Sequence, residues 1–434
     1  MIPIRTLSDL TTAELNRLFN RFGEDFTSVM IDTVIPIIND VRKNGDRAVA
    51  GYTEKFDGVK LDSIIAAPEE IEAGRRNTPQ ELYSAFLEAK RNIEEFHRLQ
   101  VRDNIRQERS DGSVLGVKYE AIESAAVYVP GGKASYPSSV LMGVIPAQIA
   151  GVGNITLITP PAKNGRLPDI VGAVCSMLNV TAVVKSGGAQ GIAAAGLGTE
   201  SVRKADIIVG PGNIYVTAAK TYLFSLGAVQ IDSMAGPSEV LIIADGRANP
   251  RWVAWDLLSQ AEHDEMAIAI LLTPSRDLAE KVRDEIEKDL ASGVGRHAIK
   301  KASIDKSGLI LLVEDIAEAV EFSNRYGPEH MEVMVEKPME WLERIRNVGS
   351  LFLGDYAPVA VGDYFSGTNH ILPTGGAARF SSGTSVETFM RRTTYQLVSP
   401  QALAHARGPV GAMSEVEGFQ DKHGGSVRVR FEES

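Results

Sequence analysis

The sequence reads AAVYVPGG at residues 125–132, NITLITPP at 154–161, TAVVKSGGAQ at 181–190 and ADIIVGPGN at 205–213. Each apolar run has the length of a buried strand, each ends in a Gly or Pro turn, and a helical pattern follows each turn. Strands that alternate with helices at this spacing predict a doubly wound parallel sheet.

Two of these turns, 187–190 and 210–213, lead directly into helices. Glycine lets the backbone approach a ligand closely, and helix N-termini attract phosphate groups. An ordinary tight turn would use the same residues. Neither turn matches the Rossmann fingerprint, and the chain has no P-loop, so these turns alone leave nucleotide binding open.

A second series of apolar runs follows at 267–274, 308–313, 330–335 and 349–355, again with helical patterns between them. We therefore expect two α/β lobes, with a tail after residue 379 that packs on another domain or another subunit. The expected boundaries are an N-terminal helical extension (1–25), a discontinuous first α/β domain (26–124 and 239–378), a second α/β domain (125–238) and a C-terminal extension (379–434).

The composition indicates which kinds of molecule the protein can bind. The 434 residues have a net charge of -11 and no basic block, which argues against nucleic acid or an anionic membrane and favours small molecules. The one cysteine, Cys175, lies in an apolar helical pattern and reads as a packing residue. No secretory signal is visible at the N-terminus, so we expect a cytoplasmic protein, or an organellar one whose transit peptide is missing.

A polar cluster, SQAEHDE (259–265), ends a helical pattern. Gln260 and His263 are three residues apart and should project from one side of its last turn. Both side chains can ligate a zinc-like ion, although glutamine is an uncommon ligand. The alternative is a solvated helix end, which the spacing alone favours.

Further polar residues lie in VGDYFSGTNHILPTGG (361–376), which contains Asp363 and His370, and in the tail, which contains His423. Gln260, His263, Asp363 and His423 together would form a set of two nitrogen and two oxygen ligands. A zinc ion there would keep about one positive charge and could attract an amine or imidazole nitrogen. Their wide spacing in the chain does not show that the four residues meet.

Glu329 and His330 are adjacent in YGPEHMEV (326–333), just after a helix that Gly327 ends. Adjacent side chains on regular structure point apart, so the two would act on a substrate from different sides or in different steps. Each has the chemistry of a general base, but a polar loop could also contain both. We expect surface positions for His97, His297 and His405.

Seven collinear blocks resemble the signature blocks of the histidinol dehydrogenase family, from about Val41 to the C-terminus: YVPGGKASYPSSVLMGVIPAQIAGV, GGAQGIAA, VGPGNIYVTAAK, AGPSEVLIIAD, SQAEHDE, YGPEHMEV and GDYFSGTNHILPTGGAARFSSG. The resemblance implies two incomplete Rossmann-like domains with small N-terminal helical and C-terminal extensions, in a homodimer.

The resemblance also implies roles for individual residues. It implies one zinc ion per subunit, bound by Gln260, His263, Asp363 and His423, with His423 reaching the site of the partner chain. NAD contacts match Tyr128, Gln190 and Asn213. The catalytic pair matches Glu329 and His330. Substrate contacts match both catalytic residues, all four zinc ligands, Ser238, His370 and Glu417.

The reaction implied is the four-electron oxidation of L-histidinol to L-histidine through L-histidinal, the last step of histidine biosynthesis. His330 would take the hydroxyl proton during the first hydride transfer to NAD. Glu329 would then activate water to hydrate the aldehyde, and a second NAD would oxidise the hydrate. Zinc would position the substrate. A hydrate route needs no thiol, which suits a chain whose one cysteine reads as buried.

Two departures leave alternatives open. The family places a substrate-binding glutamate five residues before the tail histidine, whereas Glu417 lies six before His423. The segments RRTTYQLV (391–398) and VEGF (416–419) also resemble relatives that oxidise other polyols, such as sulfopropanediol. The alternatives are therefore a paralogous NAD-dependent dehydrogenase of another amino or sulfonated alcohol, and a zinc hydrolase that uses the same ligands and base without NAD.

Overall fold

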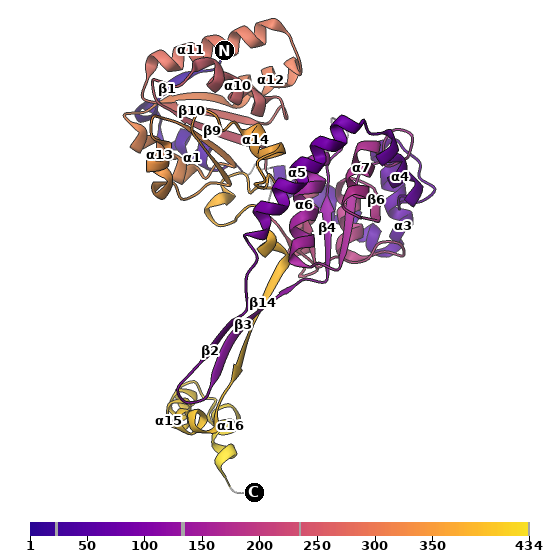
Figure 1. Cartoon of the computed structure of the whole chain (residues 1–434), viewed down its shortest axis with the longest axis vertical. Helices are drawn as coiled ribbons and strands as arrows, with labels where there is room; N and C mark the ends of the chain where they lie inside the picture. The colour runs from indigo at the N-terminus through magenta and orange to yellow at the C-terminus, as the bar shows by residue number, and fades with distance from the viewer. Residues whose placement is uncertain (22–24, 132–134, 234–235, 433–434) are drawn as a thin grey trace. The chain divides into compact units, whose positions relative to one another are not determined.

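The computed structural model describes residues 1–21, 25–131, 135–233 and 236–432. Parts of two motif blocks, at 132–134 and 234–235, lie outside these ranges. Contacts divide the chain into two compact units: unit 1 comprises Met1–Gln100 and Ile122–Phe389, and unit 2 comprises Val101–Ala121 and Met390–Ser434. Unit 1 contains two parallel sheets, each with its own helices (Figure 1).

The first sheet has six parallel strands in the order β1-β11-β10-β9-β12-β13. Alternate residues of β9 face opposite helical layers, so both faces are buried and the strands read as continuous apolar runs. In sheet order, the strands are Ile4–Thr6, Gly308–Leu312, Ile268–Thr273, Glu239–Ala244, His330–Met334 and Ser350–Leu353.

Helices cover both faces of this six-stranded sheet. Helices α10 (Pro250–Ala261), α11 (Arg276–Ser292) and α12 (His297–Ser307) pack on one face. Helices α1 (Thr12–Phe19) and α13 (Ile316–Tyr326) pack on the other, and α14 (Val359–Tyr364) follows the last strand (Figure 1).

The second sheet has five parallel strands in the order β6-β5-β4-β7-β8. In sheet order, they are Ala182–Lys185, Asn154–Thr159, Ser124–Tyr128, Ile207–Val209 and Gln230–Ile231. Helices α3 (Ile35–Asp57), α8 (Gly188–Leu197) and α9 (Ile214–Ser225) share one core with it. The surrounding helices are α2 (Asp25–Val29), α4 (Pro68–Asn77), α5 (Gln80–Arg98), α6 (Pro137–Ala150) and α7 (Asp169–Met177).

When the edge strand β1 is left out, five strands remain in each sheet, and counted in chain order these five follow the same pattern in both sheets. They are arranged 3-2-1-4-5, which is the Rossmann order without its sixth strand. The order reverses between β4 and β7 in the five-stranded sheet and between β9 and β12 in the six-stranded sheet. This confirms the expected fold class of two incomplete Rossmann-like domains.

The structure differs from the expected boundaries in three places. Helix α3, placed with the first domain, packs on the five-stranded sheet. The N-terminal extension includes β1, an edge strand of the six-stranded sheet. Residues 379–389 belong to unit 1, where Val386 and Phe389 are fully buried. An amphipathic pattern reveals an apolar face but not which of two sheets covers it, and this ambiguity explains the differences.

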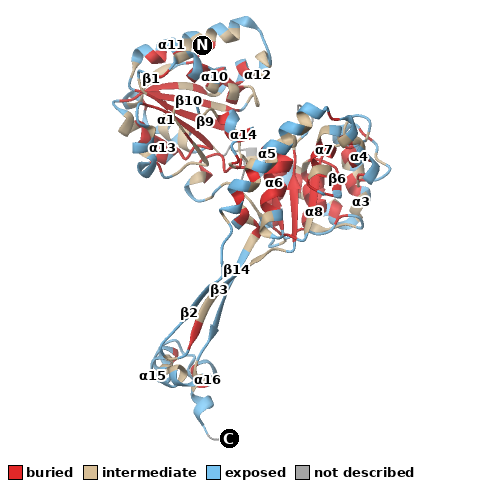
Figure 2. Cartoon of the chain, viewed as in Figure 1, coloured by how far each residue is buried: buried red, intermediate tan, exposed pale blue. Residues whose placement is uncertain are grey.

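Unit 2 is a three-stranded antiparallel sheet in the order β14-β3-β2, followed by two helices. Their bounds are β2 Ile105–Glu108, β3 Val114–Ala121, β14 Met390–Leu397, α15 Pro400–Val416 and α16 Gly425–Arg428. Most of these residues are exposed, so the tail has little core of its own, as expected (Figure 2). Its packing on another subunit stays a prediction. No helix among the described residues is long and apolar enough to cross a membrane.

Candidate active site

Glu329 and His330 lie at the amino end of β12, beside the start of β9. Helix α13 ends at Gly327, whose φ of 63° is a left-handed conformation that glycine adopts without strain. Pro328 follows, and the chain then enters β12 at His330. Both side chains are buried, with exposed fractions of 6% and 4%, so the solvated polar loop is excluded.

The backbone of Glu239 holds both of these side chains. Its N–H donates to Glu329 Oε2 at 2.8 Å, and its carbonyl oxygen lies 3.2 Å from His330 Nδ1. Because a carbonyl can only accept, His330 Nδ1 carries the hydrogen and the lone pair lies on Nε2. That Nε2 is buried without a hydrogen-bond partner among the described residues and lies 3.7 Å from Asp363 Oδ1.

Burial shifts the pKa values of Glu329 and His330 in opposite directions. It raises the pKa of Glu329 well above its usual range, and the nearby carboxylates of Glu239 and Asp363 raise it further against the opposing backbone hydrogen bond. Burial also lowers the pKa of His330 to about 4, although Asp363 acts in the opposite direction. A neutral imidazole with a free lone pair can accept a proton.

The Glu239 carboxylate is buried, and three neighbouring groups replace the water that it has lost. Arg21 Nε lies 2.7 Å from its Oε2, the Tyr326 hydroxyl donates to Oε2 at 3.1 Å, and the Gly375 N–H donates to Oε1 at 3.0 Å. A buried carboxylate needs such partners because it has lost its hydration. Sequence reasoning missed Glu239 and Arg21; the available signal was a charged residue that begins the apolar run EVLIIA (239–244).

Gln260 and His263 lie at the end of α10, and Gln260 is only 2% exposed. The solvated helix end is therefore wrong for Gln260. Its Nε2 has no hydrogen-bond partner among the described residues, and since amide nitrogen and oxygen positions can be exchanged, an oxygen ligand can occupy this place. His263 interacts electrostatically with His330 and His370.

Asp363 and His370 complete this group of side chains. His370 Nδ1 donates to the Asp363 carbonyl at 3.0 Å, and its Nε2 accepts from the Ser139 hydroxyl at 3.1 Å. Burial lowers the pKa of His370, so it is neutral. Ser238 immediately precedes β9, and its carbonyl accepts from the Ile268 N–H. The structure thus brings His330, Asp363 and His370 together, while Gln260 and His263 lie three residues apart at the end of α10.

Glu417 and His423 belong to unit 2. Glu417 caps the end of α15, and His423 lies in a short exposed helical turn at 420–424. Within the described residues, no cluster of three His, Cys, Asp or Glu side chains has metal-site geometry. The Gln260 amide, His263 and the Asp363 carboxylate nevertheless suit a cation that takes nitrogen and oxygen ligands.

Tyr128, Gln190 and Asn213 gather at the carboxyl edge of the five-stranded sheet. Tyr128 ends β4, and its hydroxyl accepts from the Gly188 N–H at 3.3 Å. Gln190 lies in the first turn of α8 with Oε1 buried and unpartnered among the described residues. Asn213 caps α9 by accepting from two backbone N–H groups. Dinucleotides bind at this edge of Rossmann-like sheets, where the strand order reverses.

At the same edge of the six-stranded sheet, Asp245 directly follows β9. One of its carboxylate oxygens accepts from the Arg247 N–H and the other from the Glu336 N–H, each at 2.9 Å. The buried polar residues Glu329 and His330 of the six-stranded sheet lie instead at its amino edge.

Three comparisons with known proteins agree. The sequence model of the family described as histidinol dehydrogenase matches residues 21–431. The chain is 48% identical over 430 residues to the histidinol dehydrogenase of Leptospira biflexa, covering 99% of both, and 44% identical over 425 residues to that of Methanothermobacter thermautotrophicus, covering 98% of this chain and 99% of the other. The chain belongs to the histidinol dehydrogenase family.

The structural comparison gives the same family. The crystal structure of histidinol dehydrogenase from Elizabethkingia anophelis superposes with a TM-score of 0.91 at 37% identity, covering 99% of this chain and 97% of that one. Members of the histidinol dehydrogenase family are oxidoreductases, and so is this chain.

The prediction that His97 lies at the surface is wrong. His97, expected at the surface, is fully buried on α5, where Nδ1 donates to the Ile93 carbonyl at 2.9 Å. Its Nε2 lies 3.3 Å from the Asn369 amide, next to His370 in the chain. The flanking charged residues suggested a surface helix, but the loop that carries His370 covers this face.

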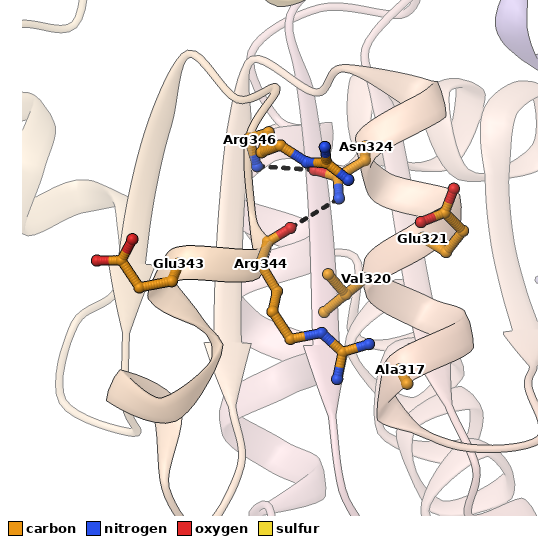
Figure 3. A pocket seen from close by; sticks show the side chains of 7 residues that line it. All are labelled: Ala317, Val320, Glu321, Asn324, Glu343, Arg344 and Arg346. Atoms are coloured by element: carbon orange, nitrogen blue, oxygen red, sulfur yellow. Dashed lines mark hydrogen bonds between the residues drawn. The ribbon is translucent and has the colours of Figure 1, made fainter.

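A separate cavity of about 260 Å³ lies along α13 (Figure 3). The amide of Asn324 is satisfied there, since it donates to the Arg344 carbonyl and accepts from the Arg346 N–H. None of the family's candidate site residues lines this cavity, and its acidic and basic side chains offer no single charge to a ligand. Its lining residues are Ala317, Val320, Glu321, Asn324, Glu343, Arg344 and Arg346.

Proposed function

We propose that this chain catalyses the NAD-linked, zinc-dependent oxidation of L-histidinol to L-histidine through L-histidinal, the last step of histidine biosynthesis. The observation that supports it most is the buried pair Glu329 and His330, held by the backbone of Glu239 beside Asp363. Membership of the histidinol dehydrogenase family supports the choice of substrate.

In the first oxidation, His330 acts as the general base. Its Nδ1–H is held by the Glu239 carbonyl, so Nε2 presents a lone pair to the substrate hydroxyl. Burial keeps the imidazole neutral at physiological pH and therefore ready to accept the proton as hydride leaves the carbon.

In the second oxidation, Glu329 acts as the general base for water. Burial raises its pKa, so the ionised carboxylate is less populated but is a stronger base once formed. The attack of water on the retained aldehyde gives a hydrate that has a hydroxyl to oxidise. The alternative thiol route lacks a nucleophile, because burial raises the pKa of the Cys175 thiol to about 12.

Gln260, His263 and Asp363, with His423 of the partner subunit, would hold the zinc ion. Tyr128, Gln190 and Asn213 would hold NAD. When bound, NAD accepts hydride and zinc orients the amino and imidazole nitrogens of the substrate. Ser238, His370 and Glu417 would contact that substrate. We place the enzyme in the cytoplasm as a homodimer that acts on a small molecule.

The substrate is tested by offering the purified, zinc-loaded protein NAD with either L-histidinol or 2,3-dihydroxypropane-1-sulfonate. We expect NADH to form with L-histidinol at a kcat/KM at least about 100-fold higher, because a site that pairs buried polar groups with a substrate rejects one that lacks the partners. Formation of NADH with the sulfonate but not with L-histidinol would instead indicate a paralogous dehydrogenase. Metal-dependent hydrolysis without NADH would favour the zinc hydrolase.

A further inference from the structure

A buried ion pair in the five-stranded lobe has no place in the reaction above. Lys220 on α9 and Asp232, just after β8, form an ion pair with side chains only 2% and 5% exposed. Removing two charges from water is costly, and the attraction between them offsets this cost only when further hydrogen bonds satisfy both groups. The remaining partners of the pair therefore indicate what it holds in place.

Both side chains bind the backbone of Gly210. Lys220 Nζ donates to the Gly210 carbonyl at 3.0 Å, and Asp232 Oδ2 accepts from the Gly210 N–H at 2.7 Å. The other carboxylate oxygen of Asp232 accepts from the Ser233 N–H at 2.8 Å. A cation and an anion thus fix the acceptor and the donor of the same glycine.

Gly210 occupies the position where β7 ends and the turn to α9 begins. Its φ of 118° suits glycine, and an added Cβ would overlap the carbonyl group of Tyr128. Residues 210–213 follow it and end at Asn213, the cap of α9. The pair therefore fixes the first residue of the turn. That residue packs against Tyr128, and the turn ends at Asn213.

We infer that Lys220 and Asp232 are positioning residues for the dinucleotide, and that they hold the 210–213 turn in the conformation that binds it. This inference rests on the proposed function, because it takes the carboxyl edge of the five-stranded sheet as the NAD site. Lys220 and Asp232 act through the backbone of Gly210, so their loss leaves the turn free to adopt other conformations, and only a fraction of molecules remains competent to bind.

The lobe contains a matched control. Glu70 and Lys185 form a second buried ion pair, at 2.9 Å, with side chains 10% and 8% exposed. Its additional partners are the Leu167 N–H and the Gly165 carbonyl, which belong to a different loop. Breaking this pair should destabilise the same lobe without touching the 210–213 turn.

The test is calorimetric titration of NAD into the zinc-loaded protein without substrate. For the folded variants Lys220→Met and Asp232→Asn we expect a Kd about tenfold or more above that of the unaltered protein, as expected if the competent turn falls to a tenth of the population. Turnover at saturating NAD should stay within about threefold, because the substrate and catalytic groups are untouched. Glu70→Gln, which breaks the control pair from α4, should leave the Kd unchanged despite a similar fall in melting temperature.

If either single variant does not fold, the double variant Lys220→Met/Asp232→Asn replaces it, since it leaves no unpaired buried charge. Equal Kd values in the unaltered protein and the variants would overturn the inference alone. The inference also fails if Glu70→Gln raises the Kd as much as Lys220→Met. Unaltered protein that does not bind NAD would overturn both the inference and the proposed function.

Discussion

The backbone carbonyl of Glu239 determines which ring nitrogen of His330 can accept a proton. Its carbonyl fixes the tautomer of His330, so the lone pair lies on the nitrogen nearest Asp363. The Glu239 carboxylate in turn is held by Arg21, which lies 218 residues away in the chain. A buried pair of this kind constrains position more than it adds stability.

Substitution of His330 with Asn tests the general-base role. We expect kcat with L-histidinol to fall by about 10²- to 10⁴-fold, because a positioned base contributes that much to proton transfer. Zinc content, measured by atomic absorption after gel filtration, should match that of the unaltered protein. Loss of zinc from this variant would instead make His330 a metal ligand.

The buried His97 predicts a dependence of stability on pH. Burial lowers its pKa in the folded state, so the folded protein resists a proton that the unfolded chain accepts below its usual pKa of about 6.5. His97 therefore supports the folded state above that pH, and this support is lost as the pH falls. Urea unfolding at about pH 7.5 and 5.5 should show the gap between unaltered protein and His97→Gln shrinking by about 1 kcal/mol on acidification. A constant gap would mean that His97 does not resist protonation.

At the residue scale, sequence reasoning succeeded where the signal is local. The adjacent Glu329 and His330 read as two bases from their side-chain chemistry, and both lie at the site. Arg21 and Glu239 were missed because their pairing depends on the folded chain. His97 was misread because the residue that covers it, Asn369, is 272 residues away.

The packing of α6 on β4 is set by one small residue. A Cβ added to Gly143 would overlap the side chain of Val127 in β4, whereas one added to Gly51 on α3 would meet nothing within 4 Å. Gly143→Ala should lower the free energy of unfolding by about 1–3 kcal/mol, since overpacking forces the helix away from the sheet. Gly51→Ala should raise it by up to about 1 kcal/mol, because alanine favours the helix. Urea titration of both variants measures this, and equal values would contradict the close contact.

At the element scale, the alternation of strands and helices was readable because both faces of each sheet are apolar. The sequence did not reveal at which edge of its sheet, carboxyl or amino, each site lies. The NAD candidates Tyr128 and Asn213 follow their strands, as strand-to-turn reasoning expects, whereas Glu329 and His330 lie at the start of β12. Helix α3 packs on a different sheet from the one expected, because its apolar face fits either one.

The whole molecule includes a largely exposed unit 2, which contains the proposed ligand His423. If His423 serves the site of the partner subunit, then mixing inactive His330→Asn chains with inactive His423→Asn chains should restore activity. Random pairing in a two-fold dimer leaves one intact site in half of the dimers, or about a quarter of the unaltered activity. Measurement after subunit exchange in mild denaturant tests this, and persistent inactivity would place His423 in the site of its own chain.

The most direct test of the whole account is the amount of NADH formed per L-histidinol consumed by the zinc-loaded protein, with the product identified by chromatography. We predict about two NADH and one L-histidine per substrate, because His330 and Glu329 serve successive oxidations at one site. We also predict that removing the metal with a chelator abolishes both. One NADH per substrate with accumulated aldehyde, or no NADH at all, would contradict the account.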